Sequence, residues 1–227
     1  MDFKYGGTDY AAHVKGMEMA AYDPRAGWGQ GLNYAVANRG GCHLNAYPIS
    51  LEALFKFIPP YTTVSKAAWV DYNENLFSAV NSIQTCQFTT YGFMLEPLIP
   101  KYTPKPFLKM AMFLLPRVAQ MLLDLSALSG LMTAITGRKL TQRTMLLAGK
   151  RIHVLERHMN CLMGISSKDD TLPNRFLTEA ETKHPDKKVV NLDPMIKQYY
   201  RIKGYGKDGI PKEQTLLKLG IDNPVGK

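Results

Sequence analysis

The stretch Ala37-Asn38-Arg39-Gly40-Gly41-Cys42-His43-Leu44-Asn45 is the part of the sequence around which the chain is organised. Two adjacent glycines allow backbone angles that other residues avoid, or a very close approach to another group. A loop of this kind can present the histidine that follows it as a proton donor. The same residues also fit a plainer interpretation, in which the glycines end the helix-like segment at 32–36 and His43 is a packing residue.

Helical patterns surround this stretch. The glycines at 27–31 predict a turn before the segment at 32–36. Residues 47–61 predict one amphipathic helix with Ser50 as its N-cap, ended by the prolines at 59 and 60. Residues 66–80 predict a second helix, with Trp69, Leu76 and Val80 on its packing side.

The second half of the chain is also helical in pattern. Residues 107–135 are interrupted by Pro116, which either kinks one helix or divides two. Apolar residues then recur at steps of four and three, which predicts a core-packed helix; they are Ala148, Ile152, Leu155, Met159 and Leu162. Asp169 and Asp170 lie in a turn and are interpreted as capping or solvated groups. Shorter helices are expected near 195–202 and 213–219.

Composition and charge limit the classes of function. With 227 residues and 45% hydrophobic content, the chain can bury a core as one large or two small domains. The formal net charge is +9, and its densest group contains Lys183, Lys187 and Lys188. Nucleic-acid binding usually needs a basic patch with interleaved aromatic residues, so we expect no nucleic-acid partner. A basic face could instead attract an acidic redox protein.

The cysteines and the apolar runs bear on location. Cys42, Cys86 and Cys161 are spaced too widely for a Cys-x-x-Cys metal site, and their odd number argues against a disulfide framework. A cytoplasmic location is therefore expected. The most apolar run, 118–135, contains Gln120 and Asp124, which favours a buried helix over a membrane span.

Three motifs, in this order, resemble the C-terminal part of the tungsten-containing aldehyde:ferredoxin oxidoreductases: His13-Val14-Lys15-Gly16-Met17-Glu18, Tyr22-Asp23-Pro24-Arg25 and Asn38-Arg39-Gly40-Gly41-Cys42-His43-Leu44. Segments 146–157, 168–173 and 199–204 agree with later parts of the same family. The resemblance covers nearly the whole chain. It implies an all-α, multihelical fold with two packed helical subdomains, 1–96 and 97–227. Their boundary is expected in the proline-rich segment 97–106.

The resemblance also implies roles for individual residues. His43 matches the family histidine beside the tungsten, which hydrogen-bonds the aldehyde oxygen or moves a proton. Cys86 ends a segment similar to the family motif Asp-x-x-Gly-Leu-Cys, whose Cys gives one thiolate to a [4Fe-4S] cluster and whose preceding residues contact the pterin. At those positions this chain has Asn81, Gln84 and Thr85. Asn81 can accept a hydrogen bond but lacks the charge of Asp.

A four-thiolate cluster needs three more cysteines, which the family places upstream in a Cys-x-x-Cys-x-x-x-Cys run that this chain does not contain. Cys86 therefore either joins ligands from an upstream chain or is an inert packed thiol. The family's reaction is oxidation of an aldehyde to a carboxylic acid at tungstopterin or molybdopterin. The electrons pass through the cluster to ferredoxin.

Two hypotheses follow. In the first, this is the C-terminal portion of such an enzyme, which works only with a missing N-terminal domain or a separate subunit and is expected to bind no cofactor when alone. In the second, it is a non-catalytic helical remnant or accessory subunit that acts as a protein-interaction module. The intact motif at 39–44 favours the first hypothesis, and the substitutions at 81–86 favour the second.

Overall fold

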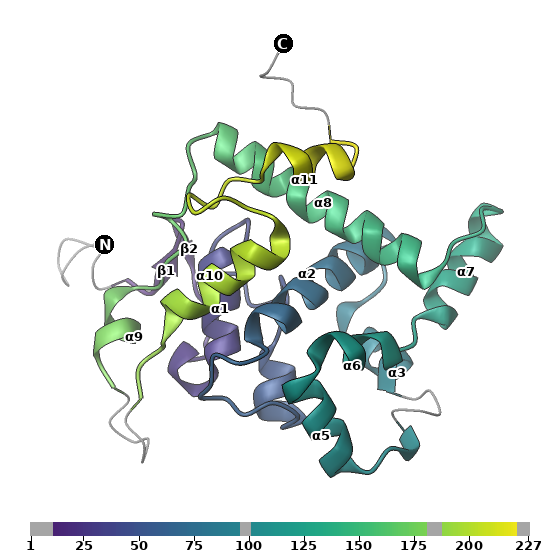
Figure 1. Ribbon diagram of the computed structural model, residues 1–227, viewed down its shortest axis with the longest axis horizontal. Helices are drawn as coiled ribbons and strands as arrows, with labels where there is room; N and C mark the ends of the chain where they lie inside the picture. The colour runs from purple at the N-terminus through teal and green to yellow at the C-terminus, as the bar shows by residue number, and fades with distance from the viewer. Residues whose placement is uncertain (1–10, 96–100, 181–187, 222–227) are drawn as a thin grey trace.

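The computed structural model describes residues 11–95, 101–180 and 188–221, and helices dominate these ranges (Figure 1). The regular β structure in the described residues is one hairpin, formed by β1 (His13–Val14) and β2 (Met17–Glu18), with His13 opposite Glu18. The expected all-α, multihelical fold is confirmed. The prolines at 97 and 100 and the lysines at 183 and 187 lie outside the described residues.

The first helices follow a short 3-10 turn, η3 (Pro24–Ala26). Helix α1 (Trp28–Val36) begins inside the glycine-rich segment for which the sequence predicted a turn, so that prediction is wrong. The physical reason is a buried carboxylate from further along the chain. Glu52 accepts hydrogen bonds from the backbone N–H groups of Gly29 at 2.8 Å and Gln30 at 3.1 Å. These are free N–H groups of the first helical turn, and an anion there stabilises the helix.

The helix predicted over 47–61 is also much shorter than expected. The structure has a five-residue π-helix, η4 (Ser50–Leu54), and Ser50 does not cap it. The backbone of Tyr47 has φ +46° and that of Lys56 has φ +55°. Both values lie in the left-handed region, which regular α-helices do not use, so the helical turn is broken on either side.

Helix α2 (Lys66–Ser82) lies at the centre of the molecule (Figure 1). It packs against α1, α8 (Gln142–Leu162) and α10 (Leu192–Lys203). Trp69, Leu76 and Val80 are all buried, so the predicted packing side of this helix is confirmed. Helices from both halves of the sequence therefore pack on α2.

The remaining helices complete the two sides of the molecule. On the side drawn at the right of Figure 1 lie α3 (Gln87–Leu95), α5 (Lys105–Leu114), α6 (Pro116–Leu122) and α7 (Ser126–Thr136). Pro116 is the first residue of α6, so it divides the predicted pattern rather than kinking it. The chain then adds α9 (Asn174–Thr178) and α11 (Glu213–Lys218).

The apolar stripe predicted to be the buried face of α8 faces outward, and that prediction is wrong. Leu155 is 44% exposed, Met159 54% and Leu162 50%. The buried face carries polar and small residues instead, including Gly149, His153 and Arg157. These residues are buried because they have specific partners on α2, α10 and the neighbouring loops, as described below.

Buried ion pairs connect the loops to the helices. Asp170 accepts hydrogen bonds from both terminal nitrogens of Arg157 at 2.8 Å, and Lys15 Nζ lies 2.8 Å from its Oδ1. Asp170 is only 2% exposed, so its interpretation as a capping or solvated group is wrong. Asp169 stabilises the turn, since its Oδ2 accepts from the backbone N–H of Ser166.

Two hydrophobic clusters form the core. One joins α1 to α8, α10 and α11, and the other joins η4 and α2 to α5, α6 and α7. Each cluster contains residues from both sides of the 97–106 segment. The division of the chain at that segment stays a prediction.

Within the part of the chain that the structure describes, no single helix has the length and apolar content of a membrane span. Helices α6 and α7 pass that test only as a pair, and they are bent by 51° at the break between them.

Candidate functional site

The loop at 37–45 is held against the β hairpin by its glycines. The backbone of Gly40 has φ +96°, and a Cβ there would collide with the carbonyl oxygen of Val14. A Cβ at Gly41 would lie 2.8 Å from the carbonyl oxygens of Met17 and Glu18. Gly40 is therefore needed for its left-handed backbone, and both Gly40 and Gly41 are needed because the loop comes too close to the hairpin for a Cβ.

Contacts from Asn33 and Arg39 hold Cys42, which follows the two glycines, in place. The buried amide of Asn33 in α1 donates to the carbonyl oxygen of Cys42 at 2.9 Å. Arg39 Nη2 lies 2.8 Å from the sulfur of Cys42, which is itself buried. Cys42 is thus part of the support for the loop.

His43 is half-buried and belongs to an aromatic cluster. Its ring centroid lies 5.5 Å from that of Tyr22 and 6.1 Å from that of Tyr47, and the two tyrosine hydroxyls are 3.2 Å apart. Tyr47 also contacts Phe88 edge to face at 5.5 Å. Because Phe88 lies two residues after Cys86, this cluster connects the histidine loop with the cysteine segment.

The surroundings of His43 favour its neutral form. Partial burial lowers the pKa of the imidazole, and the positive charge of Arg39 lowers it further. Both effects act against the imidazolium ion. At neutral pH the ring is therefore a proton acceptor.

A cavity of about 450 Å³ lies beside this loop. It is smaller than a second cavity, of about 700 Å³, elsewhere in the protein. The walls of the smaller cavity come from the loop, from the C-terminal end of α2 and from α8. The loop contributes Asn38, Arg39, Leu44 and Asn45, and α2 contributes Asn81. Two stretches that the sequence singled out separately therefore meet at one cavity.

The wall from α8 is polar and is bonded to the loop. The amide of Asn38 donates to Glu156 Oε2 at 3.0 Å and to the carbonyl oxygen of His153 at 2.9 Å. Asn160 donates to the carbonyl oxygen of Asn38 at 2.6 Å. The cavity is therefore lined by amide and carboxylate groups that can hydrogen-bond the edge of a heterocycle.

The segment from Asn81 to Cys86 leaves the end of α2 at the surface. Asn81 is exposed, and its side-chain oxygen accepts from Gln87 Nε2 at 2.8 Å. Gln84 has φ +57°, so its backbone occupies the left-handed region that favours glycine although it carries a side chain. Thr85 is half-buried and Cys86 is exposed. His43, Gln84, Thr85 and Cys86 are not among the residues that line the cavity.

Behind the cavity lies a buried polar network that the sequence analysis missed. Glu74 of α2 is fully buried and accepts from Tyr199 Oη at 2.7 Å and from Asn45 Nδ2 at 3.1 Å. Lys203 Nζ lies 2.9 Å from the same carboxylate, and His153 Nε2 lies 3.3 Å from it. Asn45 also lines the cavity, so it joins this network to the candidate site.

One group of this network, Glu74, has a strongly raised pKa. Burial raises the pKa of Glu74 to about 7, although Lys203 and Tyr199 act in the opposite direction. A carboxylate on a central helix gives no periodic signal, because the sequence pattern of α2 does not reveal that Tyr199 and Lys203 will lie against it. The local sequence carries no signal either, because Glu74 lies among the polar residues Asp71, Asn73 and Asn75.

The resemblance implies a pterin and an iron–sulfur cluster, and the residues of this chain fit the pterin better than the cluster. The amide-rich walls of the cavity suit the polar edge of a pterin. All three cysteines are free, and the described residues contain no group of three or more His, Cys, Asp or Glu side chains placed to hold a metal ion. The cysteine donors present in this chain do not make up a cluster site.

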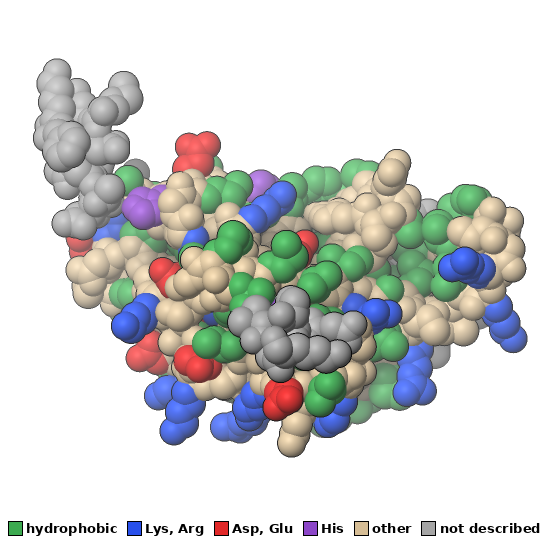
Figure 2. Space-filling model, turned by 90° about the horizontal axis from the view of Figure 1, so that it is seen from above, with side chains coloured by type: hydrophobic (Ala, Val, Ile, Leu, Met, Phe, Trp, Pro, Cys, Tyr) green, Lys and Arg blue, Asp and Glu red, His purple; other side chains and the backbone are tan. Residues whose placement is uncertain are grey.

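Lys and Arg side chains do not form one continuous patch on the face drawn in Figure 2. Figure 2 shows Lys and Arg side chains spread along the edges of the face seen from above, with hydrophobic side chains between them. This distribution agrees with the scattered charge in the sequence.

Comparison with known proteins gives consistent matches. A sequence profile for the family described as aldehyde ferredoxin oxidoreductase, domains 2 & 3, matches residues 1–221. The tungsten-containing aldehyde ferredoxin oxidoreductases of Pyrococcus horikoshii and Pyrococcus furiosus are 33% and 34% identical to the chain. Each alignment covers 96% of this chain and 32% of the relative, so the chain spans about a third of the length of these relatives.

A solved structure has the same fold. The active site complex BamBC of benzoyl coenzyme A reductase, in complex with 1,5-dienoyl-CoA, superposes with a TM-score of 0.55 at 18% sequence identity. The superposition covers 92% of this chain and 32% of that chain. The likeness extends to the helical architecture of nearly the whole chain.

Proposed function

Because the chain belongs to the aldehyde ferredoxin oxidoreductase family, as its domains 2 and 3, we propose that it is the C-terminal part of a tungstopterin and [4Fe-4S] aldehyde oxidoreductase. The overall reaction converts an aldehyde and water to a carboxylic acid, two protons and two electrons. The electrons pass to ferredoxin. The chain acts in this reaction together with the N-terminal cofactor domain, in the same polypeptide or as a separate subunit.

The observation that carries the proposal is the cavity of about 450 Å³ at which the loop 37–45 meets Asn81. In the resemblance, the first stretch holds the catalytic histidine and the second contacts the pterin. Two stretches about forty residues apart in the sequence share one polar cavity, as expected if both contribute to one site. The support is geometric and does not depend on the identity of the metal.

His43 is the proposed catalytic residue. A bound tungstopterin supplies the two-electron oxidation of the aldehyde. His43 accepts one of the released protons, and its lowered pKa keeps the ring neutral and ready to do so. The rings of Tyr22 and Tyr47 contact each other and the imidazole, and they exclude part of the water around it.

Asn81, Gln84 and Thr85 are the proposed pterin-contacting residues, and Cys86 is the proposed cluster ligand. Exposure of Cys86 suits a thiolate that joins three ligands from another part of the enzyme. The left-handed backbone of Gln84 keeps the local geometry that glycine would adopt, so the turn can still approach a cofactor. Gln87 competes for the oxygen of Asn81 and must release it for a pterin hydrogen bond.

The outward apolar stripe of α8 supports the need for a second part. Ile152 lines the cavity, and Leu155 and Met159 lie exposed on the same helix. An exposed row of large apolar side chains beside a polar cavity is typical of a surface that another domain covers. The part of the relatives that this chain does not match, about two-thirds of their length, is the natural source of that domain.

The test is reconstitution with the N-terminal part. The chain is expressed anaerobically with the pterin-binding domain of a relative, and tungsten, iron and aldehyde-dependent reduction of ferredoxin are measured. We expect all three to appear together. His43→Ala should lower turnover at least tenfold while tungsten and iron stay within a factor of two. Equal loss of tungsten and activity would contradict the catalytic role of His43.

A non-catalytic interaction module is the second candidate. It is favoured by the hydrogen bond that already occupies Asn81 and by the isolated position of Cys86 among the described cysteines. The same experiment separates the two. A stable complex with the N-terminal domain that contains neither tungsten nor iron would favour the module.

A further inference from the structure

A second cavity lies on another side of the molecule, between the segment after η4 and helix α5. It measures about 700 Å³, which is within the range of about 300–1,000 Å³ common for small-molecule sites. Its walls are mainly apolar and include Phe57, Tyr61, Met110, Phe113 and Leu114. None of the residues proposed above for the oxidoreductase site lines it.

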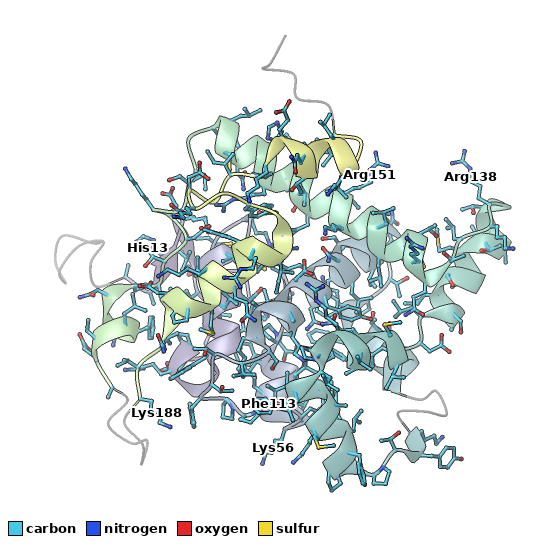
Figure 3. The ribbon with its side chains drawn as sticks, in the orientation of Figure 1. His13, Lys56, Phe113, Arg138, Arg151 and Lys188 are labelled. Atoms are coloured by element: carbon cyan, nitrogen blue, oxygen red, sulfur yellow. The ribbon has the colours of Figure 1, made fainter. Side chains whose placement is uncertain are left out.

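Two lysines supply the positive charge of this cavity. Lys56 comes from the segment after η4 and Lys109 from α5, so the two cations reach the cavity from different elements. Figure 3 shows Lys56 and Phe113 close together below α2, from these same two elements. Both lysines are exposed, and neither forms an ion pair with the described residues.

The backbone holds Lys56 in an uncommon conformation. Its φ of +55° is rare for a residue with a side chain. The neighbouring residues fix it, because Phe55 donates its N–H to Ser50 O and Phe57 donates its N–H to Leu51 O, each at 2.8 Å. Residues held in this way often occur at sites that bind ligands.

Among the described residues that line the cavity, no free carboxylate competes with the lysines. Glu52 is the acidic residue among the lining residues, and it is buried. Its carboxylate is bonded to Lys66 and to the N–H groups of Gly29 and Gln30. The cavity therefore combines an apolar wall with two cations whose charge is available to a ligand.

From this combination we propose that the cavity between η4 and α5 binds a medium-chain aliphatic carboxylate. The alkyl chain packs on Phe57, Met110 and Phe113, and the carboxylate binds between the ammonium groups of Lys56 and Lys109. Burial of the alkyl chain supplies most of the affinity, and the two lysines select an anionic headgroup over a neutral one. This site is separate from the proposed oxidoreductase site.

The test is a titration of the full 227-residue chain with octanoate, followed by NMR of 13C-methyl methionine. Met110 lines the cavity, while Met121 on α6 is 80% exposed and does not line it. We expect a saturable shift of the Met110 methyl signal with no shift of Met121. We expect 1-octanol, which lacks the charge, to bind at least tenfold more weakly.

Variants test the lysines directly. Lys56→Gln/Lys109→Gln should weaken octanoate binding at least tenfold, and both residues are exposed, so the fold should be kept. Arg138→Gln/Lys139→Gln removes the same charge after the end of α7, away from the cavity, and should leave binding unchanged. Equal binding of 1-octanol, an unchanged affinity of the first variant, or parallel shifts of Met121 would each overturn the proposal. Tighter binding of octyl phosphate than octanoate would overturn the carboxylate assignment.

The outcome is independent of oxidoreductase activity. Octanoate binding is measured on the chain alone, without the N-terminal domain or any cofactor. Failure of reconstitution would leave this proposal standing, and failure of octanoate binding would leave the proposed function standing.

Discussion

Gly149 of α8 lies directly against the backbone carbonyl of Asn75 in α2, with no room for a Cβ between them. The obstacle is backbone, which cannot rotate away as a side chain can. Since α2 and α8 form the largest helix contact in the molecule, any added atom at 149 must push the two helices apart. We expect Gly149→Ala to lower the free energy of unfolding by about 3 kcal/mol. Urea unfolding followed by circular dichroism measures this change.

Gly130→Ala is the matched control for that substitution. Gly130 also lies within a helix, α7, but a Cβ there would meet no atom within 4 Å. Alanine should therefore raise the free energy of unfolding by about 0.5–1 kcal/mol through its higher helix propensity. If both alanine variants changed stability in the same direction and by the same amount, the close approach of α2 and α8 would be wrong.

The sequence predicted the existence of most helices because their apolar spacing is local information. Helix α2 shows this clearly, with Trp69, Leu76 and Val80 buried as expected. Helix α8 shows the limit of the method. Its apolar stripe is real, but the face that packs on α2 is chosen by Gly149, which alone permits close approach, and by the partners of His153 and Arg157.

The candidate site was predictable only in part for the same reason. The double glycine and His43 are visible as a local motif, and the structure places the loop beside Asn81. The buried group behind it was not visible, because Glu74 gains its partners from residues 125 positions away, such as Tyr199. Contacts of this range are decided by packing and leave no periodic trace in the sequence.

Glu74 should make stability depend on pH. Its pKa is raised from 4.5 to about 7 by burial, so the folded protein holds this proton to a higher pH than the unfolded chain. The linked stabilisation is fully present below about pH 4.5 and is lost as the pH rises through about 7. The difference in unfolding free energy between the wild type and Glu74→Gln should therefore fall with pH across this window.

Urea unfolding at pH 4.5, 5.5, 6.5 and 7.5 measures that difference. Glu156→Gln on the exposed side of α8 is the control, because it removes a carboxylate outside the buried network. A difference between wild type and Glu74→Gln that stays constant with pH would show that folding does not raise the pKa of Glu74.

Asp170→Asn should be strongly destabilising. Although burial by itself raises the pKa of Asp170, Lys15 and Arg157 hold it below its ordinary value, so the group is a carboxylate paired with two cations. Removing its charge leaves both cations buried and uncompensated. A loss of about 3–5 kcal/mol in the free energy of unfolding is expected.

Asp169→Asn controls for the neighbouring position. Asp169 accepts from the backbone N–H of Ser166, and asparagine can accept the same bond, so a change of about 0.5 kcal/mol or less is expected. Comparable losses from the two substitutions in thermal or urea unfolding would argue against the buried ion pair.

The titration of His43 should respond to Arg39. Burial is the main cause of the lowered pKa of His43, and the guanidinium of Arg39 adds to it. Arg39→Gln should raise the pKa of His43 without restoring its ordinary value, because the burial remains. NMR titration of the imidazole protons measures this, and Arg138→Gln at the distant end of α7 should leave the curve unchanged. A fall in pKa on loss of Arg39 would mean that the two side chains do not face each other.

The hydrogen bonds from Gly29 and Gln30 to Glu52 have a consequence for the order of folding. Helix α1 contains two glycines, so its intrinsic tendency to form is low, and its N-terminal end is completed by a residue 23 positions later in the chain. A helix of this kind gains its stability only after a loop has closed around Glu52 and Lys66. The loop 37–45 follows directly from α1, so we expect its shape to become defined together with the contacts of Glu52 rather than before them.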